Sequence, residues 1–271
     1  MIPDTPSVIH AIRETAAIEI MPRFRSLSEM DIMEKNPGDL VTTSDIESEK
    51  RLGHMLGKLA PECAIIGEES ADEAPERLRA LNEAAPVWVI DPLDGTRNYA
   101  RGIPCFAVIV AYCLGGKTRA GWIYDPITDV TVWALEGEGA WMAEGSETDA
   151  RQRLKTTQNV EMASMIGSFS VRTGKKFDSN PNDAPQTLRY GSTGREYMDL
   201  AIGKLHFAHY AKRLKPWDHA AGILVHRESG GFSALCADGL AYSPGLEIIR
   251  KDILMAPNKD CWETVNALIS K

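Results

Sequence analysis

Two stretches near the start of the chain carry apolar residues at helical spacing. In the first, about residues 7–27, the repeat predicts a helix that Pro22 kinks or divides. The second begins at Ser44, which with Glu47 forms the pattern of a capping box and leads into a further apolar repeat. Between them, two short extended runs flank Pro37-Gly38, which predicts a hairpin.

Short apolar runs bounded by turn residues predict strands through the rest of the chain. In the first half they lie at residues 64–70, 87–90, 105–112, 120–124, 129–134 and 140–142. Glycine-rich and Asp-Pro turns join the last four runs, which predicts an antiparallel meander. In the second half, strands are predicted at 163–169 and 205–210, loop and polar helix at 170–186, and helices from about 191, 216 and 259.

A polar segment at residues 144–160 is the expected boundary between two packed subdomains. The predicted N-terminal subdomain, residues 1–145, is α+β, and the predicted C-terminal subdomain, residues 146–271, is α/β. The predicted fold class is therefore α+β / α/β.

Composition restricts the classes of function. The 271 residues carry a formal net charge of −8, which argues against broad non-specific binding to nucleic acid or to an anionic membrane. The five cysteines are scattered without a C-x-x-C pair, which favours reduced thiols over a zinc site or a disulfide frame. No signal peptide and no apolar run long enough to span a bilayer are visible, so we expect a cytoplasmic protein with no membrane partner.

The most informative stretch is Asp91-Pro92-Leu93-Asp94-Gly95-Thr96-Arg97-Asn98, which follows the apolar run at 87–90. Pro92 stiffens the turn, and Gly95 permits an unusual dihedral angle or a close backbone approach. Two carboxylates on a rigid turn repel each other unless a cation lies between them, and a hard divalent metal is the simplest such cation. The alternative is an ordinary turn with solvated acids.

Further acids lie at strand ends and helix starts. Asp45 falls in the first turn of a predicted helix, where compensation of the helix dipole is the commoner use. Glu68 ends a predicted strand, where solvated acids are common, and Asp218 starts a predicted helix. Gly191-Ser192-Thr193 opens another helix, whose N–H groups either hold an anion or a polyol or simply begin the helix.

Taken in order, Gly67-Glu68-Glu69, the stretch from Asp91 to Asn98, and Trp217-Asp218-x-Ala-Ala-Gly resemble the inositol monophosphatase family of metal-dependent phosphatases, over nearly the whole chain. The resemblance implies a layered αβαβα sandwich in which residues 1–145 bind metal and phosphate and residues 146–271 complete the active site. It also implies a homodimer, two or three Mg²⁺ per subunit, and inhibition by lithium. The implied activity is hydrolysis of a small alcohol or sugar phosphate by metal-activated water, as in an inositol-phosphate phosphatase.

The resemblance assigns roles to single positions. The implied metal ligands are Glu68, Asp91, the backbone carbonyl of Leu93, Asp94 and Asp218, with Asp91 bridging two ions and Glu68 also helping to hold a weaker third one. The candidate catalytic residues are Asp45, Thr96 and Glu68, of which Thr96 and Asp45 would orient the attacking water. The candidate substrate contacts are Gly95, Thr96, Gly191, Ser192, Thr193, Arg213 and Asp218. General chemistry agrees, because two metals can clamp the attacking and leaving oxygens of an in-line displacement.

One departure from the family pattern concerns the substrate. Members that favour inositol phosphates carry an acid seven positions before the Trp-Asp aspartate, and here that position is Ala211, followed by a basic segment at 212–215. We therefore hypothesise that Arg213 and its neighbours meet an additional negative charge, as in fructose 1,6-bisphosphate or an adenosine 3′,5′-bisphosphate; a solvated basic surface is the alternative. Lys35 either approaches the phosphate or lies on the surface, and His219 is not expected to bind metal.

Two other functions compete with this interpretation. Phosphatases of the haloacid dehalogenase type also contain Asp-x-Asp-Gly-Thr, but their two acids are two positions apart, whereas Asp91 and Asp94 are three apart. Some bacterial relatives serve in RNA-processing or transcription complexes, which makes a non-catalytic binding role an alternative. Because the acidic chain offers no basic stripe, we expect no direct binding of nucleic acid.

Overall fold

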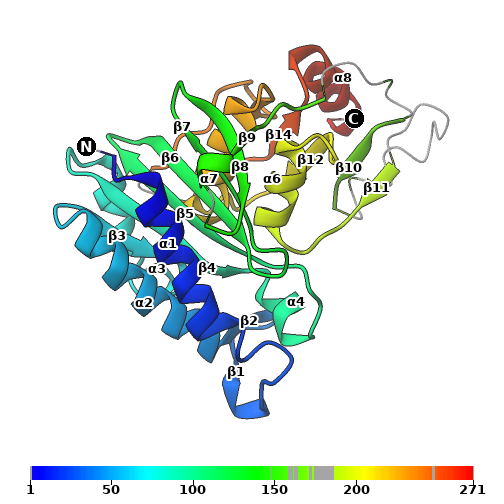
Figure 1. Ribbon diagram of the computed structural model, residues 1–271. Coiled ribbons are helices and arrows are strands. Elements are labelled where there is room, and N and C mark those ends of the chain that lie inside the picture. The colour runs from blue at the N-terminus through cyan, green and yellow to red at the C-terminus, as the bar shows by residue number, and fades with distance from the viewer. Residues whose placement is uncertain are drawn as a thin grey trace.

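The computed structural model describes residues 2–146, 148–157, 161, 164–170, 173, 186–245 and 248–270. Within this part of the chain, seven strands form one sheet in the order β3-β4-β5-β6-β7-β8-β9 (Figure 1). The strands are β3 (Ala64–Gly67), β4 (Val87–Asp94), β5 (Ala107–Leu114), β6 (Lys117–Asp125), β7 (Val130–Leu135), β8 (Gly139–Glu144) and β9 (Gln152–Arg153). β3 and β4 are parallel, and the other neighbours are antiparallel, so the predicted meander is confirmed.

The two faces of this sheet belong to different cores. Trp88 and Ile90 of β4 pack in the core formed with α1 (Thr5–Thr15) and α2 (Thr43–Leu59), which lie side by side in Figure 1. Val87 and Val89 pack in the opposite core. This alternation follows from the two-residue period of a strand, so an unbroken apolar run here means a strand that is buried on both faces.

The N-terminal helix is shorter than predicted. α1 ends at Thr15, and a π-helical segment, η1 (Ala16–Ile20), follows it. Pro22 comes after the last helical residue, so the predicted continuation to residue 27 is wrong. A proline cannot donate the N–H that a further helical turn requires, which is consistent with the end of the helix just before it.

The start of α2 also differs from the prediction. Thr42 is the N-cap, and its N–H and hydroxyl donate to Asp45 Oδ2 at 2.8 and 2.5 Å. Ser44 already lies inside the helix, where its hydroxyl oxygen is 2.8 Å from that of Tyr99, so the predicted capping box of Ser44 and Glu47 is wrong. The real cap fixes one oxygen of Asp45 and leaves the other for a partner outside the helix.

A second sheet of five strands, in the order β11-β10-β12-β14-β13, lies to the right of the first in Figure 1. Its strands are β10 (Ile166–Ser168), β11 (Gln186–Leu188), β12 (Phe207–Tyr210), β13 (Phe232–Leu235) and β14 (Ile253–Ala256). α6 (Thr193–Ala201) and α7 (Pro216–Glu228) share a core with both sheets, and α8 (Lys259–Ile269) covers the outer face of the second. The predicted αβαβα layers are confirmed, and α8 begins at its predicted start, Lys259.

Helix α7 approaches the first sheet closely. A Cβ on Gly121 of β6 would lie 2.7 Å from the Cα of Ala221, nearer than packed atoms tolerate. α7 and β9 both follow residue 145, yet both pack with the first sheet. The division into subdomains 1–145 and 146–271 stays a prediction.

Short elements complete the fold. β1 (Ile32–Asn36) and β2 (Asp39–Thr42) form the predicted hairpin; the others are α3 (Glu68–Glu73), α4 (Thr96–Ala100), η2 (Glu29–Asp31), η3 (Pro75–Asn82) and η4 (Thr148–Ala150). α3 begins where β3 ends, so the strand predicted to residue 70 stops at Gly67. Ala163 and most of segment 170–186 lie outside the described residues. Among the described helices, none combines the length and the apolar character that a membrane crossing needs.

Candidate active site

A bulge at the end of β4 brings two acids close together. In a regular strand, residues three apart point to opposite faces. Asp91 and Asp94 pair with Ile109 and Ala107 of β5, so three steps along β4 match two along β5. Pro92 lies in this bulge and has no N–H to give to the ladder. Burial, and then the charges of neighbouring acids including Asp94, raises the pKa of Asp91 well above its ordinary value.

Three carboxylates from three separate segments converge beside this bulge. Oxygens of Glu68, Asp91 and Asp218 lie within 4.8 Å of one another. Glu68 begins α3 directly after β3, Asp91 lies on β4, and Asp218 lies in the first turn of α7. Because β3 and β4 are parallel neighbours, their carboxyl ends deliver two of these acids at the same edge of the sheet.

Glu49 of α2 holds the segment that carries Glu68. Its two carboxylate oxygens accept hydrogen bonds from the N–H groups of Glu69 at 2.7 Å and Ser70 at 3.0 Å. The approach is so tight that a Cβ on Gly67 would lie 2.1 Å from Glu49 Cδ. Sequence reasoning missed Glu49, because nothing in its local pattern indicates that α2 lies beside the start of α3.

Asp94 lies next to the group of three and is bound by the start of α6. Its Oδ1 accepts from the N–H of Thr193 at 3.0 Å, and its Oδ2 accepts from the N–H of Gly194 at 2.7 Å and from the hydroxyl of Ser192. N–H groups at a helix start favour a negative charge, and here they hold one that belongs to the protein itself. The role of Asp94 as a metal ligand, and those of Gly191, Ser192 and Thr193 as substrate contacts, stay predictions.

The donor set of the group of three fits a hard divalent cation. Burial, and then the charge of Glu68, raises the pKa values of Asp91 and Asp218 well above their ordinary range. Acids that repel one another in this way are stabilised by a cation between them. Because the group offers carboxylate oxygens and neither imidazole nor thiolate, it suits Mg²⁺ or Ca²⁺ better than zinc.

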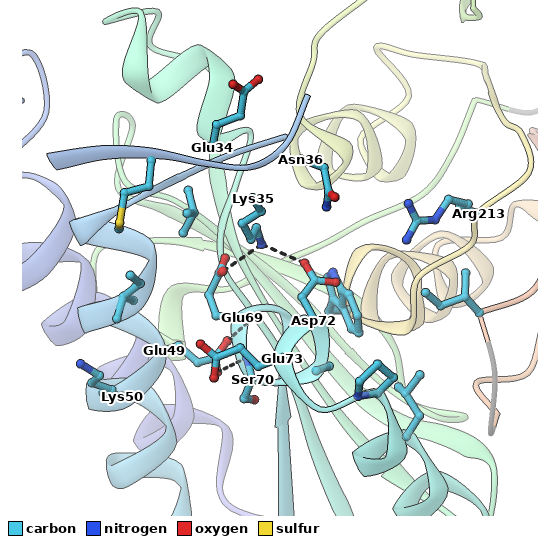
Figure 2. A pocket seen from close by; sticks show the side chains of 18 residues that line it. Glu34, Lys35, Asn36, Glu49, Lys50, Glu69, Ser70, Asp72, Glu73 and Arg213 are labelled. Atoms are coloured by element: carbon cyan, nitrogen blue, oxygen red, sulfur yellow. Dashed lines mark hydrogen bonds and ion pairs between the residues drawn. The ribbon is translucent and has the colours of Figure 1, made fainter. Parts of the chain in front are cut away.

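Two lysines neutralise part of this negative charge. Lys215 Nζ lies 2.7 Å from Glu68 Oε1. Lys35 Nζ lies 2.8 Å from Glu69 Oε2 and 2.9 Å from Asp72 Oδ2, and Figure 2 shows it reaching from the hairpin to these two acids. Sequence reasoning left the place of Lys35 open and treated Lys215 only as part of a basic segment, since neither contact has a local signature.

A hydroxyl beside the carboxylates is linked to a further buried acid. Thr96 Oγ1 lies 2.8 Å from Asp45 Oδ1 and 3.0 Å from the backbone oxygen of Leu93. Asp45 is 2% exposed, and its burial raises its pKa to about 6. A hydroxyl has one proton, so a bond donated to Asp45 leaves the Leu93 oxygen open to another partner.

The shape of the loop after β4 depends on Gly95 and on the side chain of Asn98. Gly95 has a φ of 94°, and a Cβ there would lie 3.1 Å from the backbone oxygen of Cys105 and 3.3 Å from that of Gly191. Asn98 Nδ2 donates to the backbone oxygens of Cys105 and Tyr190, both at 2.8 Å. The loop is thereby fastened to the segment that precedes α6.

A cavity of about 810 Å³ opens beside α3, between the β1–β2 hairpin, α2 and Arg213 (Figure 2). Lys35 and Asp72, which are bonded to each other, line this cavity together with Asn36 and Arg213. Figure 2 draws no hydrogen bond or ion pair from Arg213 to the other residues that line the cavity. The exposed Ala211 follows β12 directly. The predicted role of Arg213 as a substrate contact stays a prediction.

His219 contributes to packing in the described structure. It is 2% exposed, its Nδ1 lies 3.1 Å from the hydroxyl of Tyr197, and its ring packs on Tyr210 with centroids 4.8 Å apart. Burial lowers its pKa to about 3, so the imidazole is neutral at ordinary pH.

Comparison with known sequences covers almost the whole chain. A sequence model described as the inositol monophosphatase family matches residues 6–270. An inositol-1-monophosphatase of Bacillus subtilis is 34% identical over 202 residues, which is 72% of each chain. A fructose-1,6-bisphosphatase/inositol-1-monophosphatase of Thermotoga maritima is 29% identical over 207 residues, 74% of each chain. The Nus factor SuhB of Vibrio cholerae is 29% identical over 248 residues, 89% of this chain and 88% of the relative.

Solved structures share the fold. The Thermotoga maritima IMPase superposes with a TM-score of 0.79 at 23% identity and covers 97% of this chain and 94% of its own. A calcium-bound IMPase family protein of Staphylococcus aureus superposes with a TM-score of 0.76 at 23% identity, over 96% and 92% of the two chains. At these identities the likeness concerns the arrangement of layers and strands.

Proposed function

Because the chain belongs to the inositol monophosphatase family, we propose that it hydrolyses the phosphomonoester of a small alcohol or sugar with the help of bound Mg²⁺. The observation that carries this proposal is the convergence of Glu68, Asp91 and Asp218, whose oxygens lie within 4.8 Å of one another. Acids that raise one another's pKa at the edge of a sheet are costly to the fold, and such groups are typical of functional sites.

The residues that would hold two Mg²⁺ are Glu68, Asp91, Asp94, Asp218 and the carbonyl of Leu93. When bound, Mg²⁺ lowers the pKa of a water molecule and neutralises charge on the phosphate. The three hydrogen bonds from the start of α6 fix the orientation of Asp94 for this role. The weaker third ion implied by the family resemblance would have to bind at Glu68, where Lys215 already lies.

Thr96 and Asp45 would position the attacking water and take its proton. The hydroxyl of Thr96 lies between Asp45 Oδ1 and the Leu93 oxygen, so it can accept a hydrogen bond from water while donating to Asp45. In this proposal the N–H groups of Gly95 and Thr96 contact the phosphate. Residues 191–193, together with Asp218, border the alcohol part of the substrate.

Phosphate release from a panel of esters tests the activity. The panel comprises inositol 1-phosphate, fructose 1,6-bisphosphate and adenosine 3′,5′-bisphosphate, each with Mg²⁺. Asp91→Asn is a suitable control, because asparagine keeps the size and the Oδ1 that accepts the N–H of Leu93 at 3.1 Å. We expect hydrolysis of at least one ester by the natural chain and near-background rates for the variant. Equal rates for the two proteins, or no release from any ester, would contradict the proposal.

One feature of the chain favours a bisphosphate as the substrate. Arg213 lies at the cavity beside α3, and Ala211 stands where inositol-specific members have an acid. The Thermotoga maritima relative is named as acting on fructose 1,6-bisphosphate as well as inositol 1-phosphate, which supports testing both substrates here. A guanidinium group can bind a phosphate through two parallel hydrogen bonds.

A binding role in an RNA-processing or transcription complex is the second candidate function. It is supported by the similarity to the Vibrio cholerae protein that is named a Nus factor. The net charge of −8 favours a protein partner over direct contact with RNA. A homodimer and a cytoplasmic location are further proposals, and light scattering on the purified chain tests the first of them.

A further inference from the structure

Three of the four acids of α3, Glu68, Glu69 and Asp72, are bonded to a lysine. Lys215 Nζ lies 2.7 Å from Glu68 Oε1, and the two side chains are 16% and 15% exposed. Lys35 Nζ bonds Glu69 and Asp72 and remains 4.0 Å from Glu68 Oε1. The three acids thus share two ammonium groups. The Glu68 oxygen nearest to each group is Oε1, and the hydrogen bonds of the described residues include none to Oε2.

The backbone and a neighbouring ring hold Lys215 in this position. It is the N-cap residue of α7, and Pro216 at the next position fixes the first φ angle of the helix. Its Nζ also lies 5.2 Å from the centroid of the Trp217 ring, which attracts a cation over its face. Trp217 is 2% exposed, so the platform under the ammonium group is part of the core.

We propose that Lys215 is a built-in cation that occupies the position at Glu68 where a third metal ion would bind, so that this chain holds two metal ions and not three. This inference rests on the proposed function, because it presumes that the carboxylate group binds metal. Glu68 has two oxygens. Lys215 takes Oε1, and Oε2 is left for one metal ion.

Distances and charge explain why the two cations exclude each other. Mg²⁺ binds a carboxylate oxygen at about 2.0–2.1 Å. An ammonium nitrogen at 2.7 Å from the same oxygen would lie within a few ångströms of such an ion, and the two positive charges would repel strongly at low dielectric. The neighbouring acids offer no substitute, because Lys35 already bonds both Glu69 and Asp72. Lys215 therefore supplies one positive charge where a divalent ion would supply two.

Counting bound Mn²⁺ tests the inference without measuring activity. The electron paramagnetic resonance signal of free Mn²⁺ is followed as the purified chain is titrated, up to millimolar metal. We expect two sites in the natural chain and three in Lys215→Met. Lys215→Arg, which keeps the charge, should return the count to two. Lys212→Met removes a charge at an exposed position three residues earlier and should leave two sites.

The possible outcomes distinguish a failure of this inference from a failure of the proposed function. No Mn²⁺ site in the natural chain, or an unchanged count in Asp91→Asn, would contradict the metal site itself. Three sites in the natural chain would overturn the role of Lys215 while the proposed function stands, and this result needs no variant. Two sites in a folded Lys215→Met, judged by circular dichroism, would overturn it as well.

Discussion

Thr96 Oγ1 lies 2.8 Å from Asp45 Oδ1, across 51 positions of sequence. The contact joins the loop after β4 to the first turn of α2, and it connects a hydroxyl at the carboxylate group to an acid that is 2% exposed. The other oxygen of Asp45 is held by Thr42. The pair therefore has the geometry of a relay that can orient a water molecule and move its proton.

Removing the hydroxyl of Thr96 should slow hydrolysis while metal binding persists. Thr96→Val keeps the shape and loses the donor, and we expect kcat to fall about 10²- to 10⁴-fold, the usual contribution of a positioned proton acceptor. Thr96→Ser restores the hydroxyl and should recover most of the rate. Phosphate release with Mg²⁺ is the measurement. A Thr96→Val protein with the natural rate would exclude the relay.

Activity should fall at acidic pH because of Asp45. Its burial raises its pKa to about 6, and it can take a proton through Thr96 only when it is ionised. We expect kcat to rise with pH through about 6 and then level off. Asp45→Asn cannot ionise, so its small residual rate should lack this step. The comparison is made with pH–rate profiles of the two proteins at fixed free Mg²⁺. Identical profiles would contradict the role of Asp45 as the proton acceptor.

The metal-free protein should become more stable when Asp91 is neutralised. A carboxyl whose pKa is raised in the folded state binds its proton more tightly there than in the unfolded chain. It therefore contributes stability below the unfolded value of about 3.9, and this contribution is lost as pH rises through the folded pKa. Because the pKa of Asp91 is raised well above the ordinary value, Asp91→Asn should have the higher Tm at pH 8.

The expected gain in Tm is roughly 2–4 °C, the shift that about 1 kcal/mol produces in a domain slightly smaller than this one. The difference between the two proteins should shrink as pH falls toward 4. Added Mg²⁺ should raise the Tm of the natural chain and leave that of Asp91→Asn unchanged. Thermal unfolding in chelator at several pH values provides the measurement, and a lower Tm for the variant at pH 8 would contradict the electrostatic argument.

Arg213 should favour substrates with a second phosphate. Arg213→Gln is expected to lower kcat/KM for fructose 1,6-bisphosphate about tenfold or more relative to inositol 1-phosphate. A hydrogen bond to a charged group contributes roughly 1.5–3 kcal/mol, and about 1.4 kcal/mol is tenfold. Arg213 is changed alone because Lys215 is bonded to Glu68, so a variant of the whole basic segment would disturb the metal site as well. An unchanged ratio would mean that Arg213 does not select the substrate.

Gly95 should tolerate no side chain. Gly95→Ala would combine a positive φ of 94° with a Cβ only 3.1 Å from the oxygen of Cys105. Gly137→Ala is the matched control, because Gly137 has a φ of 84° and no atom within 4 Å of the added Cβ. Backbone strain alone should lower the free energy of unfolding of the control by about 1–2 kcal/mol. Crowding should lower that of Gly95→Ala by roughly 1–3 kcal/mol more. Urea unfolding of both proteins measures the difference, and equal losses would remove the crowding argument.

The amino-acid sequence by itself determined the family, the order of most helices and strands, and the identities of the acids. It could do so because these features are local: an apolar run predicts a buried strand, and Pro92 and Gly95 mark a stiff turn at its end. The same local logic failed at the start of α2, where both Thr42 and Ser44 are good caps and only the packed helix selects Thr42.

Only the tertiary structure decided which charges lie together. Lys215 and Glu68 are 147 positions apart, Asp94 meets the start of α6 about 100 positions later, and Glu49 holds α3 across 20 positions. No periodicity or motif encodes such pairs, because each depends on how the layers pack after the strands have formed. The physical reason is that an ion pair or a helix-end contact is set by distance in space, whereas the sequence pattern reports only neighbours along the chain.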